Sequence, residues 1–126
     1  MPQIDLIEES FVVAEAHRVA AVLRDPARWV TWWPDLSLSV FQDRAEQGVR
    51  WTVSGALVGS MEVWLEPHAD GVIVHHYVRA DMAGDRTPRP RTVTREARRR
   101  ARHAKRLFWA LKDELEGARR PGEGIS

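Results

Sequence analysis

The chain contains no cysteine, which excludes disulfide bonds, thiolate nucleophiles and cysteine-ligated metals. It also lacks a long hydrophobic run: the apolar stretch at residues 19–23 is far shorter than the roughly 20 residues that span a bilayer. The first ten residues, MPQIDLIEES, carry acidic side chains and lack the basic start and apolar core of a secretory signal. We therefore expect a cytoplasmic protein.

Motifs of covalent, phosphate-binding and metal chemistry are missing as well. No Gly-x-Ser-x-Gly turn occurs, and the glycines at 55 and 59 are followed by no Lys-Ser or Lys-Thr step. Neither a His-x-x-x-His spacing nor a carboxylate cluster supplies ligands for zinc. The sequence thus predicts no metal and no cofactor.

The length of 126 residues fits one domain. We place this domain at residues 1–118 and expect residues 119–126, rich in glycine and charge, to form a flexible tail.

A net charge of +1 hides a strong asymmetry along the chain. Residues 1–85 carry a net charge of −7, whereas residues 86–106 carry +9. This basic belt either pairs with the acidic remainder, which we favour, or binds an anionic partner such as a membrane surface. Nucleic acid is a weaker candidate, because no aromatic residue interleaves the arginines. We expect these basic side chains on the solvent face of a helix: Arg95, Arg98, Arg99, Arg100, Arg102, Lys105 and Arg106.

Residues 24–34, RDPARWVTWWP, hold three of the six tryptophans between two prolines. Pro26 favours the first turn of a short helix, and Pro34 pushes the residue before it toward extended geometry. Trp29 and Trp33 are four residues apart and so share one face of that turn. Such an apolar plug must pack against another apolar surface, which we expect to be a concave sheet.

Alternation of apolar and polar residues predicts about five strands, at residues 4–13, 36–41, 49–53, 61–65 and 72–80. Residues 15–23 have helical periodicity and separate the first two strands.

Turn residues then predict the strand register. An Asp-Gly turn between the last two strands pairs Val63 with His76 on one face and Trp64 with His75 on the other. A three-residue turn between the glycines at 55 and 59 would set Trp51 opposite Val63.

The C-terminal part predicts one long amphipathic helix that ends near Gly117. Its apolar residues recur in steps of 3 and 4 over about 30 Å, at Val93, Ala97, Ala101, Ala104, Phe108, Leu111 and Leu115. The alanines permit close backbone approach or leave room for another molecule.

In this order of elements, and in the turn Asp25-Pro26…Trp29…Trp32-Trp33-Pro34, residues 3–117 resemble the START-like superfamily. The branch that they resemble is the polyketide cyclase/dehydrase branch, also called the SRPBCC or helix-grip group. The resemblance implies an α+β fold, in which an antiparallel sheet wraps around a long C-terminal helix and two short helices follow the first strand. It also implies a hydrophobic cavity that binds lipids, sterols or polyketides, and some members act as aromatases or cyclases.

The chain departs from this family in one respect. The sequence predicts about five strands, with seven as the alternative, whereas the family usually has about two more strands in the meander than five. A five-stranded sheet would put the size of any cavity in question and could leave a sheet edge open for pairing with a second copy.

His76 is the strongest candidate for a ligand-binding or catalytic residue, since it lies in the middle of an apolar strand face. A neutral imidazole there can hydrogen-bond to a ligand oxygen or act as a general base; the alternative is a core histidine satisfied by a neighbour or water. We expect Trp33 and Phe41 to close one end of the cavity. The complete predicted lining is Trp33, Phe41, Trp51, Met61, Val63, His76, Val78, Ala101, Ala104, Phe108 and Leu111.

Three functions are compatible with this sequence. The first is binding or transport of a lipid-like or polyketide-like molecule between the sheet and the last helix. The second is a cyclase or aromatase that uses His76 as its acid and base. The third is a ligand-free interaction module, whose tryptophans fill the core and whose sheet edge or arginine face contacts a partner.

Overall fold

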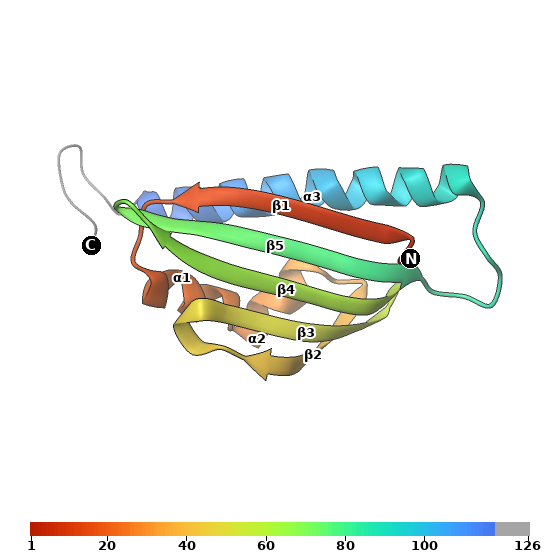
Figure 1. Ribbon diagram of the computed structural model, residues 1–126, viewed down its shortest axis with the longest axis horizontal. Coiled ribbons are helices and arrows are strands. Elements are labelled where there is room, and N and C mark those ends of the chain that lie inside the picture. Colours follow the sequence, from red (N-terminus) through yellow and green to blue (C-terminus); the bar gives the residue numbers. More distant parts are fainter. Residues whose placement is uncertain (118–126) are drawn as a thin grey trace.

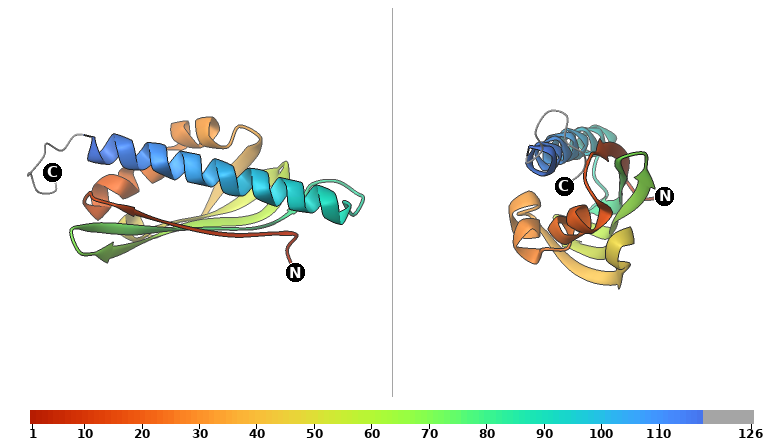
Figure 2. Two further views of the ribbon diagram at one scale, coloured as in Figure 1. Left: turned by 90° about the horizontal axis from the view of Figure 1, so that it is seen from above. Right: turned by 90° about the vertical axis from the view of Figure 1, so that its left-hand side faces the viewer.

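Two layers make up the computed structural model, which describes residues 1–117 (Figure 1). One layer is a five-stranded antiparallel sheet, and the other consists of helices that cover one of its faces (Figure 2). In chain order the elements are β1 (Ile4–Val12), α1 (Ala16–Leu23), α2 (Pro26–Trp32), β2 (Leu36–Asp43), the short 3-10 helix η1 (Ala45–Gln47), β3 (Gly48–Gly55), β4 (Leu57–His68), β5 (Gly71–Met82) and α3 (Pro90–Glu116). The predicted tail at 119–126 lies outside the described residues.

The sheet has the order β1-β5-β4-β3-β2. Strands β2 to β5 form a meander, and β1 joins it beside β5. Because β1 and β2 lie at opposite edges, α1 and α2 carry the chain across the sheet, on the face that α3 also covers (Figure 2). The predicted fold class, a five-stranded sheet with two short helices and one long C-terminal helix, is confirmed.

Residues 24–34, which we call the tryptophan turn, form the short helix that their sequence predicts. Asp25 caps α2 by accepting a hydrogen bond from the backbone N–H of Ala27 at 3.0 Å, and Pro26 occupies the first helical turn. Trp29 and Trp33 both pack edge-on against Trp51 of β3, with ring centroids 5.4 and 5.8 Å away. These tryptophan rings therefore occupy space between the sheet and the helices.

The β4–β5 hairpin has the predicted register, with Val63 opposite His76 and Trp64 opposite His75. The predicted register of β3 and β4 is wrong by two residues, because Trp51 lies opposite Met61 and not opposite Val63. The turn is tighter than expected: Gly55 has φ +102°, and a Cβ there would lie 2.7 Å from the backbone oxygen of Asp35. The shift of two residues leaves every side chain on its predicted face.

Helix α3 packs closely against the edge strand β1 and runs alongside it (Figure 1). Its buried residues include Ala104, Phe108, Leu111 and Leu115, as the predicted seam requires. The prediction that Arg100 lies on the solvent face of the helix is wrong. Its side chain is only 6% exposed and faces the protein interior.

Trp33 should contribute heavily to stability because it is almost fully buried. Replacing it with alanine (Trp33→Ala) is expected to lower the free energy of unfolding by about 3–5 kcal/mol, measured by urea denaturation. Trp109→Ala is the matched control, since Trp109 is 63% exposed, and it should change stability by less than about 0.5 kcal/mol. Equal losses in both variants would contradict this account of the core.

Candidate functional site

His76 lies on β5, at the centre of the sheet face that the helices cover. It is 1% exposed, and neither ring nitrogen has a hydrogen-bond partner within residues 1–117. Its ring stacks on Trp33 at 6.0 Å and contacts the ring of Phe108 at 5.1 Å. The structure thus holds a polar ring between aromatic walls with both of its nitrogens unpaired.

Burial lowers the pKa of His76 to about 4, and the nearby His103 adds a smaller effect in the same direction. At neutral pH the ring is therefore uncharged. A neutral imidazole donates a hydrogen bond from one nitrogen and accepts one at the other, so it can recognise a hydroxyl or a carbonyl.

The space beside His76 is small. Its volume is about 10 Å³, which admits roughly one water molecule. The predicted ligand-sized cavity is therefore absent from the part of the chain that the structure describes, because tryptophan and core side chains fill it. The walls of the remaining gap are Leu6, Trp33, Leu36, Val53, Leu57, Met61, His76, Val78, Arg100, His103 and Ala104.

Five of the predicted ligand-binding residues line this gap: Trp33, Met61, His76, Val78 and Ala104. Four others lie in the surrounding core without reaching the gap: Trp51, Val63, Phe108 and Leu111.

The other two predicted residues lie outside the core. Ala101 is half-buried on α3. Phe41 is 68% exposed and lies beneath the guanidinium of Arg50, 5.4 Å from it. The prediction that Phe41 closes one end of the space is wrong: Val40 pairs with the inward-facing Trp51, so the next residue, Phe41, lies on the uncovered face of the sheet. A bulge follows between Val40 and Gln42.

Two polar wall residues, Arg100 and His103, were missed from the sequence. Arg100 falls three residues after Ala97 and four before Ala104, which is the spacing of the apolar seam. That periodicity could have placed Arg100 inward, but its charge suggested the solvent face. His103 lies against α2, where its Nε2 is within hydrogen-bond distance of the backbone oxygen of Trp32.

A partly buried ion-pair network fastens α3 over the gap, and we call Asp35, Glu96 and Arg100 the clasp. The guanidinium of Arg100 donates to both carboxylate oxygens of Asp35, at 3.1 and 2.6 Å, and to Glu96 at 3.1 Å. Partial burial opposes ionisation of Asp35, but hydrogen bonds and charge from Arg100 outweigh it and hold the pKa of that carboxyl below its ordinary value. Since Asp35 directly follows Pro34, the clasp joins α3 to the tryptophan turn.

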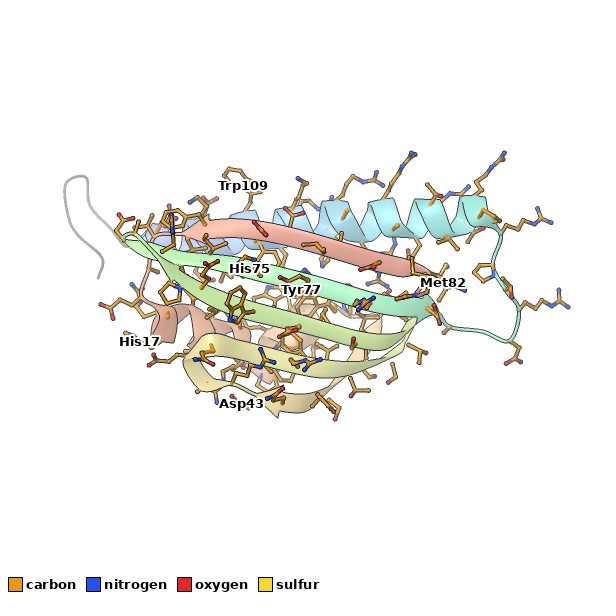
Figure 3. All side chains as sticks on the ribbon, in the orientation of Figure 1. His17, Asp43, His75, Tyr77, Met82 and Trp109 are labelled. Carbon is orange, nitrogen blue, oxygen red and sulfur yellow. The ribbon has the colours of Figure 1, made fainter. Side chains whose placement is uncertain are left out.

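The opposite face of the sheet is uncovered and carries a second aromatic cluster (Figure 3). His75 stacks on Trp64 at 4.5 Å, and its Nε2 lies 2.8 Å from a carboxylate oxygen of Glu66. Tyr77 stacks on the other side of the imidazole at 6.4 Å. These side chains cover the backbone of β4 and β5.

Within residues 1–117, no group of histidine and carboxylate side chains is arranged to hold a metal ion. In the same residues, no helix combines the length and apolar character needed to cross a bilayer.

No protein-family model and no curated protein matches this chain. Solved structures do match. The solution structure of the Aha1 dimer from Colwellia psychrerythraea superposes with a TM-score of 0.61 at 15% sequence identity, covering 90% of this chain and 96% of that one. The chain has a helix-grip fold.

Two further helix-grip structures agree with this assignment. The crystal structure of DR_A0006 from Deinococcus radiodurans gives a TM-score of 0.53 at 15% identity, covering 79% of this chain and 95% of that one. The crystal structure of Ara h 8.0201 gives 0.51 at 16% identity, covering 87% and 95%. At such identities the likeness establishes the fold of SRPBCC type, and the polyketide cyclase branch stays a prediction.

The lowered pKa of His76 predicts a loss of stability in acid. Between pH 6.5 and 4 the unfolded chain binds a proton that the folded protein excludes, so the free energy of unfolding falls as the pH falls through this window. From pH 7 to pH 4.5 the loss due to His76 should be about 2 kcal/mol.

The comparison that isolates this effect uses His76→Phe, which keeps the aromatic contacts and has no titrating group. Urea denaturation at both pH values should show that the variant loses about 2 kcal/mol less than the parent protein. An identical pH dependence in both proteins would show that His76 is not buried in its neutral form.

Proposed function

We propose that this protein binds a small molecule with an apolar body and one hydroxyl or carbonyl group, such as a lipid-like or polyketide-like compound. The ligand would lie between the sheet and α3, with its polar group on His76. The observation that carries the proposal is the fully buried imidazole, with two nitrogens that have no hydrogen-bond partner within residues 1–117, at the edge of a largely apolar gap.

Energetics support a binding role for this histidine. A buried polar group without a hydrogen bond costs about 1–3 kcal/mol, whereas an apolar side chain of similar shape has no such cost. A ligand oxygen that pairs with His76 would recover this free energy on binding. The surrounding side chains, which include Met61, Val78 and Ala104, would supply the apolar contact.

Entry of a ligand requires the space to open. Helix α3 rests against β1 along one side, and on the other side the clasp fastens it to the tryptophan turn. The side chain of Asp35 is 39% exposed, so water can reach this end of the clasp and compete for its hydrogen bonds. We therefore expect a minor open state, in which α3 has moved away from the tryptophan turn, and a ligand that selects it.

Binding is better supported than the cyclase alternative, which depends on the same histidine. A general base needs a group that orients it, and no side chain within residues 1–117 hydrogen-bonds to His76. A pKa of about 4 also makes the imidazole a weak base at neutral pH.

The binding proposal can be tested with Nile red, an uncharged apolar probe whose fluorescence rises in apolar surroundings. Ala104 is buried in the wall of the gap, so Ala104→Leu should fill the space and weaken probe binding at least tenfold. Ala110→Leu is the matched control, because Ala110 is exposed on the same helix and its replacement should leave binding unchanged.

Circular dichroism would verify that Ala104→Leu still folds, since overpacking costs about 1–3 kcal/mol. Equal probe binding in both variants would contradict a site beside Ala104. Native mass spectrometry of the protein from its own host should also show an adduct of a few hundred daltons that is lost on denaturation.

We also propose a homodimer formed by pairing of two β2 strands. β2 is an edge strand, and residues 36–42 contain no charged side chain, although charge is a common protection of exposed edges. Val40 and Phe41 are 47% and 68% exposed there. The bulge after Val40 would limit the pairing to residues 36–40.

Sedimentation velocity tests this dimer. The parent protein should sediment as a dimer, and Val40→Lys should sediment as a monomer, because a lysine on an edge strand opposes pairing with a second strand. Val58→Lys on the uncovered sheet face is the control, with Val58 54% exposed, and should stay dimeric. A monomeric parent protein would refute the proposal.

A further inference from the structure

Helix α3 carries a line of arginines that form no ion pair within the described part of the chain. Arg91, Arg95, Arg98, Arg102 and Arg106 follow one another in steps of 4, 3, 4 and 4, which places them along one side of the helix. All five are exposed, and none forms an ion pair with any residue among 1–117. We call these five residues the arginine stripe.

The stripe corrects the expectation that the basic belt is neutralised by the acidic remainder of the chain. Ion pairs do form with Arg99, Arg100 and Lys105, which approach Asp35, Glu96 and Glu8 from the two flanks of the helix. The arginines between these flanks point away from the acidic groups. Five positive charges without ion-pair partners among residues 1–117, on about four turns of helix, create a strong local potential.

Trp109 extends the same line. It lies 18 residues, or five helical turns, after Arg91, and its side chain is 63% exposed. Figure 3 shows it projecting from α3 away from the sheet, on the side where nitrogen-tipped side chains also project. A large indole left in water beside a row of guanidinium groups is unusual for a surface with no partner.

We infer that this side of α3 binds the surface of an anionic lipid bilayer. The stripe and Trp109 together form a straight line about 27 Å long, which can lie parallel to a flat surface. Guanidinium groups pair well with lipid phosphates and carboxylates, and tryptophan favours the level of the headgroups. The inference stands independently of the proposed function.

The composition of the line also sets the depth of binding. Trp109 is the single large apolar side chain on it, so the helix would rest on the headgroups and not enter the acyl chains. Attachment would therefore be reversible and would weaken as salt is added. A single-stranded nucleic acid fits less well, because it needs several aromatic rings for successive bases and the line offers one.

The test is co-sedimentation of the full chain with vesicles of 30% phosphatidylserine and 70% phosphatidylcholine, compared with pure phosphatidylcholine. The parent protein should bind the anionic vesicles and not the vesicles of pure phosphatidylcholine, and 0.5 M salt should release it. Arg95→Gln/Arg98→Gln should weaken binding about 25-fold, since each arginine near an anionic surface contributes about fivefold.

Two controls separate the stripe from net charge. Arg50→Gln/Arg79→Gln removes the same two charges from the uncovered sheet face and should leave vesicle binding unchanged. Trp109→Ala should weaken binding several-fold and abolish the blue shift of tryptophan emission that the parent protein shows on anionic vesicles.

Three results would overturn the inference. They are equal losses in the two double arginine variants, equal binding to the two kinds of vesicle, and no binding to either. Tighter binding to duplex DNA than to anionic vesicles, lost in Arg95→Gln/Arg98→Gln, would assign the stripe to nucleic acid instead.

Discussion

The partly buried ion pair between Arg100 and Asp35 is the contact on which the rest of the structure depends. It links α3 to the residue that follows the tryptophan turn. The helix that covers the gap and the turn that closes it are therefore held together. Such a pair adds little net stability, but removing Asp35 would leave the buried charge of Arg100 with fewer partners, which is destabilising. Glu96 shares the guanidinium and would reduce that penalty. The pair therefore specifies where α3 lies more than it strengthens the fold.

The short sheet explains why the gap is closed. With five strands there is little concave area, and the rings of Trp29 and Trp33 pack onto Trp51 within it. The two edges of this sheet are treated differently. Along β1, Lys112 donates to the backbone oxygen of Phe11 and Glu116 accepts from the backbone N–H of Val13, so α3 protects that edge. No such protection is present along residues 36–40 of β2.

Local features made most of the fold predictable. The Asp-Gly turn set the β4–β5 register, and Asp25 with Pro26 set the start of α2, because each depends on residues close in sequence. The β3–β4 register failed because Gly55 adopts a positive φ against Asp35, a contact that its neighbours do not encode. Arg100 was misplaced for a similar reason, since its partner Asp35 is 65 positions away. The gap volume depends on how several indole rings pack together, which periodicity does not describe.

The central claim is that His76 recognises a polar group on an apolar ligand. Nitrogen NMR of the histidine rings reports this most directly, because it observes both nitrogens of His76 in the bound and free protein. Adding an apolar alcohol or ketone that binds should move these two resonances, while the ring stays neutral at pH 7. A ligand that binds and leaves the His76 resonances unchanged would contradict the account.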